Sequence, residues 1–68
     1  MDDYYVNKNQ QETGEHEVHK DGCKHMPLSH NRTYLGKFLS CKGAIIKAKE
    51  KYKNVDGCYY CANACHTR

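Results

Sequence analysis

The chain has 68 residues, a formal net charge of +3 at pH 7, five cysteines, five histidines and no tryptophan. This length allows one domain and no second, and a domain this short buries only about 60% of the surface that its unfolded chain exposes. No apolar run approaches the roughly 20 residues of a membrane span. These features exclude a large self-sufficient core, and they indicate that disulfides, a metal ion or a partner chain stabilise the fold.

The first half of the sequence predicts a β-hairpin followed by a third strand. Residues 4–6 are aromatic and β-branched, which is typical of a strand. Residues 7–14 are polar and end in a glycine, so they indicate a loop. Residues 15–19 alternate as a second strand, and residues 33–39 predict a third, in which Gly36 favours a bulge.

The second half predicts one helix. Ser40 is a good N-cap, and the residues that follow place apolar side chains at helical spacing along one face. Residues 54–57 end the helix. We therefore expect an α+β fold, zinc-ribbon-like and metal-stabilised, with a small hairpin, a third strand and one helix in the C-terminal half. The inner face of the helix is made of Cys41, Ala44, Ile45, Ala48 and Tyr52.

One domain is expected over residues 1–68, with fraying at residues 1–3 and 67–68. The chain has six tyrosines, and they carry much of the apolar surface. We expect Tyr34 and Tyr52 in the core. Tyr5 and one residue of the Tyr59-Tyr60 pair should be partly buried.

Two pairs of metal-ligating side chains have the spacing of a zinc site. Cys58-x-x-Cys61 lets both sulfur atoms turn toward one ion, and the glycine before it gives the backbone the freedom this needs. His19-x3-Cys23 is a second pair, at the end of a predicted strand. Together the four residues predict a closed Cys3His site that holds one structural Zn2+ and ties the hairpin to the end of the helix.

Cys65 and His66 follow closely and are alternative candidates for the fourth ligand. Cys41 lies on the inner face of the predicted helix, and the favoured interpretation is a small buried apolar residue. In an oxidising compartment, Cys41 and Cys65 could form a disulfide and leave the metal set intact.

The remaining histidines do not indicate catalysis. His16-Glu17-Val18-His19 lacks the H-E-x-x-H spacing and the helix of a zinc protease. We expect His16 on the surface of a strand, and His25 and His30 in a solvent-facing loop. With no open metal position, serine triad or general base in view, the sequence does not predict an enzyme.

The cysteines and the absence of a visible signal predict the compartment, and the charge distribution suggests a partner. No secretory signal is visible, so we expect a cytoplasmic protein whose thiols stay reduced and bind metal. Residues 22–68 carry nine Lys and Arg against two acids. A soluble helix surface is the favoured interpretation of these lysines, and binding of nucleic acid is the alternative. That alternative depends on Lys42, Lys47, Lys49 and Lys53. We expect the chain to be a monomer.

Nearly the whole chain resembles a group of short, uncharacterised bacterial Cys/His-rich proteins. The resemblance rests on Glu17-Val-His-Lys-Asp-Gly-Cys23, Asn31-Arg-Thr-Tyr-Leu-Gly-Lys-Phe38, Gly57-Cys-Tyr-Tyr-Cys61 and Cys65-His-Thr67. That group implies a fold and no activity.

A looser resemblance is to the zinc-binding module of the bacterial methylphosphotriester DNA repair protein and to the tails of some nucleases. These modules share the order of a ligand-x3-Cys pair, an Asn-containing segment, a helix with inner alanines and a Cys-x-x-Cys pair. The resemblance implies His19, Cys23, Cys58 and Cys61 as ligands, with Ala44 and Ala48 packing the helix. The chain departs from the repair module at His19, where the module has its methyl-accepting cysteine, so methyl transfer is not expected. Cys23 and Cys58 also lie farther apart here, and the Cys65-His66 tail is extra.

Three hypotheses remain from the sequence, in order of preference. The first is a zinc-stabilised module that binds nucleic acid or a protein. The second is an exported domain held together by disulfides without a metal. The third is a redox protein that uses Cys58 and Cys61, which is disfavoured because the pair follows a helix instead of starting one.

Overall fold

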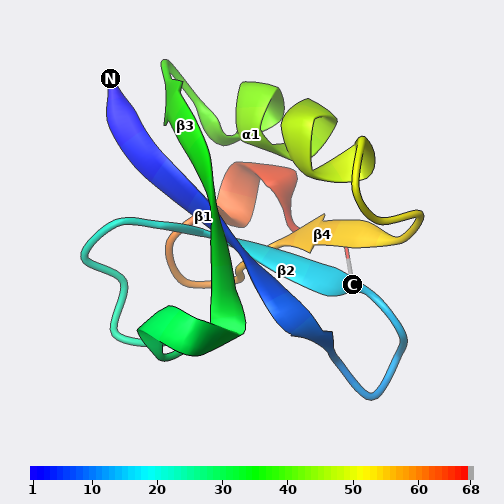
Figure 1. The fold of residues 1–68 in the computed structure, drawn as a ribbon. Helices are drawn as coiled ribbons and strands as arrows, with labels where there is room; N and C mark the ends of the chain where they lie inside the picture. Colours follow the sequence, from blue (N-terminus) through cyan, green and yellow to red (C-terminus); the bar gives the residue numbers. More distant parts are fainter. Residues whose placement is uncertain (68) are drawn as a thin grey trace.

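The fold is a four-stranded sheet with one helix packed on it, within residues 1–67, which are described by a computed structural model (Figure 1). The strands are β1 (Asp2–Gln10), β2 (His16–Lys20), β3 (Arg32–Phe38) and β4 (Val55–Gly57), and the helix is α1 (Cys41–Lys49). Two short 3-10 helices are η1 (Ser29–Asn31) and η2 (Asn63–Cys65). The predicted α+β class is confirmed, with one more strand than expected.

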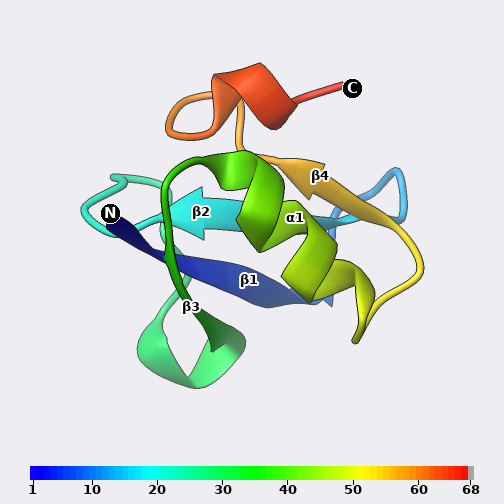
Figure 2. The ribbon, with the colours of Figure 1, turned by 90° about the horizontal axis from the view of Figure 1, so that it is seen from above.

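The order of the strands in the sheet is β3-β1-β2-β4. β1 pairs antiparallel with both β2 and β3, whereas β2 and β4 are parallel. A parallel pair needs a long connection between its strands. Here α1 belongs to that connection: it follows one edge strand and precedes the other, and it lies across one face of the sheet (Figure 2). The connection brings the chain after β4 to the end of β2.

The end of β1 and the presence of β4 differ from the prediction. Residues 7–10 continue β1 instead of forming a loop, because Asn7 pairs with Arg32 of β3 and Gln10 pairs with His16 of β2. β4 was not predicted, since three residues contain no alternation pattern to detect. The strand forms because these residues pair with β2, although their own sequence does not indicate a strand.

The helix begins where predicted, because Lys42 N–H donates to the Ser40 hydroxyl oxygen. It ends at Lys49, about one turn earlier than expected. Tyr52 N–H still donates to Ala48, but the chain must then turn so that Asn54 can accept from His16 N–H at the start of β4.

The core lies between α1 and the sheet. Val6 and Val18 are opposite each other on β1 and β2, and with Ala44 and Ala48 of the helix they are completely buried. The bulge predicted at Gly36 is present, because the register between β1 and β3 shifts there. The full set of buried apolar residues is Tyr4, Val6, Val18, Leu35, Cys41, Ala44, Ala48, Cys58 and Ala62.

The predictions for Tyr34, for the Tyr59-Tyr60 pair and for His16 were wrong. Tyr34 is 53% exposed, because it pairs with Tyr5 on the sheet face opposite α1, while its neighbour Leu35 enters the core. Tyr59 and Tyr60 are both exposed. His16 is buried, and its ring stacks on Tyr52 at a centroid distance of 3.7 Å.

The chain ends that were expected to fray are partly tied down. Asp2 and Asp3 belong to β1 and pair with the end of β3. Thr67 donates from its N–H and its hydroxyl to Asp56 Oδ1. Position 68 lies outside the described residues.

Candidate metal centre

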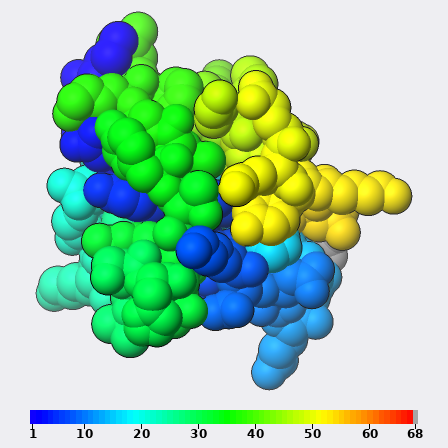
Figure 3. Space-filling view, viewed as in Figure 1, coloured from blue at the N-terminus to red at the C-terminus, as the bar shows by residue number. Residues whose placement is uncertain are grey.

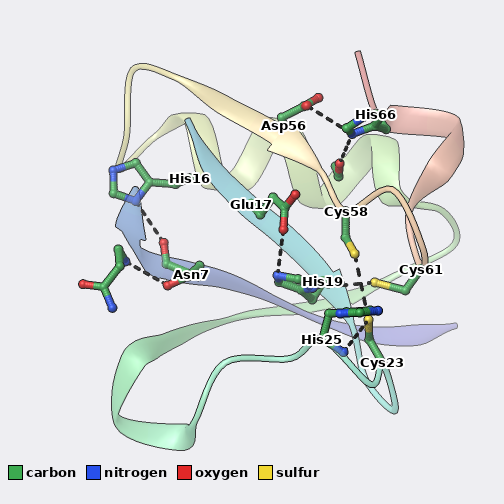
Figure 4. Close-up of polar contacts among 12 residues, drawn as sticks. Asn7, His16, Glu17, His19, Cys23, His25, Asp56, Cys58, Cys61 and His66 are labelled. Carbon is green, nitrogen blue, oxygen red and sulfur yellow. Dashed lines mark hydrogen bonds and ion pairs between the residues drawn. The ribbon is translucent and has the colours of Figure 1, made fainter. Parts of the chain in front are cut away.

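Four side chains from two distant parts of the chain meet at one end of the sheet. The ligand atoms of His19, Cys23, Cys58 and Cys61 all lie within 4.8 Å of one another (Figure 4). His19 is the penultimate residue of β2, and Cys58 directly follows β4. Since β2 and β4 are parallel neighbours, their C-terminal ends bring the two predicted ligand pairs together.

The first pair is held by the turn that ends β2. Cys23 N–H donates to the Lys20 carbonyl oxygen at 3.1 Å, which closes the turn. Gly22 has a φ of +90°, a region that residues with a Cβ seldom occupy. The Asp-Gly step therefore directs the Cys23 thiol back toward the His19 ring.

The second pair is held by the continuation of the sheet. Cys58 N–H donates to the Val18 carbonyl oxygen at 2.9 Å, and Ala62 N–H donates to the Cys58 carbonyl oxygen at 2.9 Å, so the loop returns on itself. Gly57 is tightly enclosed: a Cβ there would lie 2.6 Å from the Ala62 carbonyl oxygen and 2.8 Å from Cys65 Cβ. Only glycine fits where β4 gives way to the Cys-x-x-Cys loop.

The separations between ligand atoms suit one tetrahedral ion. The Sγ atoms of Cys23 and Cys58 are 3.9 Å apart, and so are Cys61 Sγ and His19 Nδ1. Two sulfur atoms bound at about 2.3 Å to the same tetrahedral zinc ion lie roughly 3.8 Å from each other. With all four ligand atoms within 4.8 Å of one another, the four residues lie close enough to hold a metal ion.

Glu17 orients the His19 ring. Both side chains lie on the sheet face opposite Val18, and His19 Nε2 is 3.4 Å from Glu17 Oε1 while Nδ1 faces Cys61. A carboxylate behind a metal-binding imidazole fixes the tautomer and the ring orientation. Burial lowers the pKa of His19 to about 4, with a smaller contribution from the charge of His25. The ring is therefore neutral at pH 7, with its proton on Nε2 for Glu17 and its Nδ1 lone pair available to a metal.

Backbone amides support the sulfur atoms. Lys20 N–H donates to Cys61 Sγ at 3.2 Å, and His25 N–H donates to Cys23 Sγ at 3.4 Å. Burial still raises the pKa of the Cys61 thiol to about 12 when no cation is near. A bound cation is what would deprotonate the thiols, because a coordinating thiol loses its proton outright.

The alternative ligands lie elsewhere. Cys65 forms a disulfide with Cys41, with an S–S distance of 2.03 Å. His66 Nδ1 is 2.9 Å from the Gly57 carbonyl oxygen and 3.3 Å from Asp56 Oδ2. Among the described residues, neither belongs to the group of side chains that could hold a metal.

The disulfide corrects the favoured interpretation of Cys41. That residue is buried against the core, as expected, but it is covalently bound and not a free thiol. The bond joins the first residue of α1 to η2, four positions after Cys61. It therefore anchors the far side of the Cys-x-x-Cys loop to the helix without using any of the four clustered side chains.

Sequence reasoning missed the residues that support the ligands. Glu17 was noted only as part of a motif that was rejected, although its position two residues before His19 on the same strand face was a usable signal. The amide donors of Lys20 and His25 have no sequence signature. His25 and His30 are exposed, as predicted.

Comparisons of the chain with family models, curated proteins and solved structures found no match. The resemblances drawn from the sequence therefore stay predictions. Within the described part of the chain, no helix has the length and apolar character required to cross a membrane.

Proposed function

We propose that the chain is a small monomeric binding module whose fold is stabilised by one structural zinc ion held by His19, Cys23, Cys58 and Cys61. The observation that carries the proposal is the convergence of these four side chains within 4.8 Å, from segments nearly forty residues apart in sequence. Domains with so small a core commonly depend on a metal or on disulfides.

The donor set supports zinc as the ion. Three sulfur atoms and one imidazole nitrogen are soft or borderline ligands, which favour zinc over the oxygen-seeking magnesium and calcium. Each ligand pair lies at the end of a strand, and this arrangement supports the zinc-ribbon-like architecture as part of the proposal.

A structural role is favoured over a catalytic or redox role. Four protein ligands complete a tetrahedral site, and a catalytic zinc ion needs one position for water or substrate. Redox-active cysteines have lowered thiol pKa values, whereas burial raises the pKa of Cys61. We infer that the domain binds a partner and does not transform a substrate.

A basic surface makes nucleic acid one candidate partner. The side chains of Lys42, Lys47, Lys49 and Lys53 are all exposed, although Lys47 also contacts Glu50 at 3.3 Å. The end of α1 and the turn after it, in yellow, lie at the surface in the upper right of Figure 3. If these lysines bind phosphates, affinity for DNA should fall steeply with added salt, and a Lys→Ala series should reduce that dependence. No binding at low salt would remove nucleic acid from the proposal.

The disulfide supports a second candidate for the compartment. Disulfides persist in oxidising compartments and are rare in the cytoplasm, where we first placed the chain. The bond between Cys41 and Cys65 uses none of the four clustered side chains. Export to an oxidising compartment is therefore compatible with zinc binding. Trapping thiols in intact cells distinguishes a cytoplasmic dithiol from an exported disulfide.

Cobalt substitution tests the metal proposal. Cobalt(II) in a tetrahedral site with three thiolates gives strong sulfur-to-metal charge-transfer absorption and intense ligand-field bands. We expect both from the wild-type chain, and we expect zinc to displace the cobalt. Cys58→Ser should abolish the bands, whereas His30→Ala, which changes an exposed histidine outside the cluster, should leave them unchanged. Weak octahedral spectra from the wild-type chain would refute the closed Cys3His site.

A further inference from the structure

A cleft of about 310 Å3 opens beside the metal centre, on the sheet face opposite α1. Its size is at the lower end of small-ligand pockets, which hold roughly 300 to 1,000 Å3, so it suits a single side chain or a small organic group. Two of its lining residues, His19 and Cys58, belong to the metal centre. The others are Asn7, Gln11, Glu17, His25, Tyr59 and Tyr60.

Two tyrosine rings form perpendicular walls of this cleft. The ring centroids of Tyr59 and Tyr60 are 5.1 Å apart, and their planes meet at 87°. His25 stacks on Tyr60 at 4.0 Å and supports that ring from the opposite loop. Both tyrosines are more than half exposed, at 57% and 68%, although large aromatic side chains usually gain stability by burial. Perpendicular aromatic walls of this kind are found where proteins enclose an organic cation.

Acidic side chains lie in and beside the same cleft. Glu17 lies in it, with its carboxylate oxygen 3.4 Å from His19 Nε2. A second cavity of about 420 Å3 shares Glu17 and adds Glu12, Glu15 and Asp56. With a divalent ion bound, three thiolates and a neutral imidazole leave the metal centre with a charge of about −1. An anionic ligand would be repelled here, whereas a cation would be attracted by both the acids and the ring faces.

We propose that this cleft binds an organic cation, an ammonium or guanidinium group such as a lysine or arginine side chain of a protein partner. The Tyr59 and Tyr60 rings contact the cation, and Glu17 pairs with its charge. The inference rests on the proposed zinc-stabilised module, because the Cys58-x-x-Cys61 loop that holds the metal also carries both tyrosines. It deepens that function by assigning the module a cationic peptide as its partner.

The test uses zinc-loaded protein with its disulfide intact and a set of short peptides. The peptides are identical except for one residue, which is lysine, trimethyllysine, arginine or the neutral isostere norleucine. Nuclear magnetic resonance titrations report the affinity and the residues whose amide signals move. We expect the cationic peptides to shift the signals of Glu17, Tyr59 and Tyr60, and to bind at least about tenfold more tightly than the norleucine peptide. Tetramethylammonium alone, titrated against sodium at equal ionic strength, shows whether a free amine suffices or a peptide is required.

Variants separate the cleft from the rest of the surface. Tyr60→Leu should weaken binding about two- to thirtyfold, and Tyr60→Phe should retain it, because the ring face makes the contact. Glu17→Gln should weaken binding of the cationic peptides while preserving an oxygen for His19. Tyr34→Leu is the matched control, since it removes another exposed tyrosine that does not line the cleft.

Three results would overturn the proposal. The first is that the norleucine peptide binds as tightly as the cationic peptides. The second is that the shifted signals map outside the cleft. The third is that the protein binds single-stranded nucleic acid and none of the cations. The metal content of each variant is measured before any ligand is added. A wild-type chain without zinc would refute the proposed function by itself, whereas zinc-loaded, folded protein that ignores cations would refute only this inference.

Discussion

The disulfide between Cys41 and Cys65 should contribute a measurable part of the stability of the fold, and replacing both residues by alanine tests this. The bond joins positions separated by 24 residues. The chain-entropy relation for a loop of this length gives about 12 cal/mol/K, or about 3.5 kcal/mol at 25 °C, as the stabilisation lost. For a domain of this size, that loss corresponds to a decrease of roughly 14 to 28 °C in the melting temperature.

Urea unfolding followed by circular dichroism, with zinc and with chelator, measures this change. Zinc at 100 times its dissociation constant should return about 2.7 kcal/mol to the variant, so chelation should unfold a larger fraction of the variant than of the wild-type chain. Metal content is the control, because Cys41 and Cys65 lie outside the metal-binding group. A destabilisation below about 1 kcal/mol would show that the disulfide does not constrain the unfolded chain. A variant that no longer binds zinc would mean that Cys65 is a ligand.

Three further predictions concern the metal centre. Cys58→Ser should unfold the chain or reduce its zinc affinity by orders of magnitude, because metal binding is coupled to folding; a folded, chelator-resistant variant in circular dichroism would contradict this. Glu17→Ala should weaken zinc binding about 10- to 100-fold in competition with a chromogenic chelator, while Glu17→Gln should keep most of the affinity; equal affinities for all three proteins would show that the carboxylate does not orient His19. Zinc affinity should be greatest at alkaline pH and fall as the pH is lowered through neutrality, because the thiols must lose protons, including Cys61 with its raised pKa, whereas His19 stays neutral down to about pH 4. Calorimetry in buffers of different ionisation enthalpy should detect protons released from thiols at pH 7, and a pH-independent affinity would refute this assignment.

The sequence predicted which four side chains cluster because their signal is local. A Cys-x-x-Cys pair after a glycine and a His-x3-Cys pair at the end of a strand each bring two donors together regardless of the rest of the fold. The helix was equally accessible, since Ser40 caps it and Ala44 and Ala48 mark its inner face.

What failed depends on pairing between distant segments. β4 has only three residues, and it exists because β2 offers it a parallel partner. Tyr34 was expected in the core from its apolar ring, but the bulge at Gly36 reverses which residues of β3 face α1. His16 is buried because Tyr52 arrives from the other end of the chain to stack on it. No window of sequence contains these contacts.

The central claim is that His19, Cys23, Cys58 and Cys61 bind one zinc ion while Cys41 and Cys65 form a disulfide. Native and denatured mass spectrometry of protein purified without added metal, combined with a thiol count, tests it most directly. The expected result is one zinc ion per chain, a denatured mass lower by two hydrogens than that of the fully reduced chain, and three thiols that react only after chelation, since two of the five cysteines are bonded to each other. A metal-free chain with Cys58 or Cys61 in a disulfide would contradict the claim.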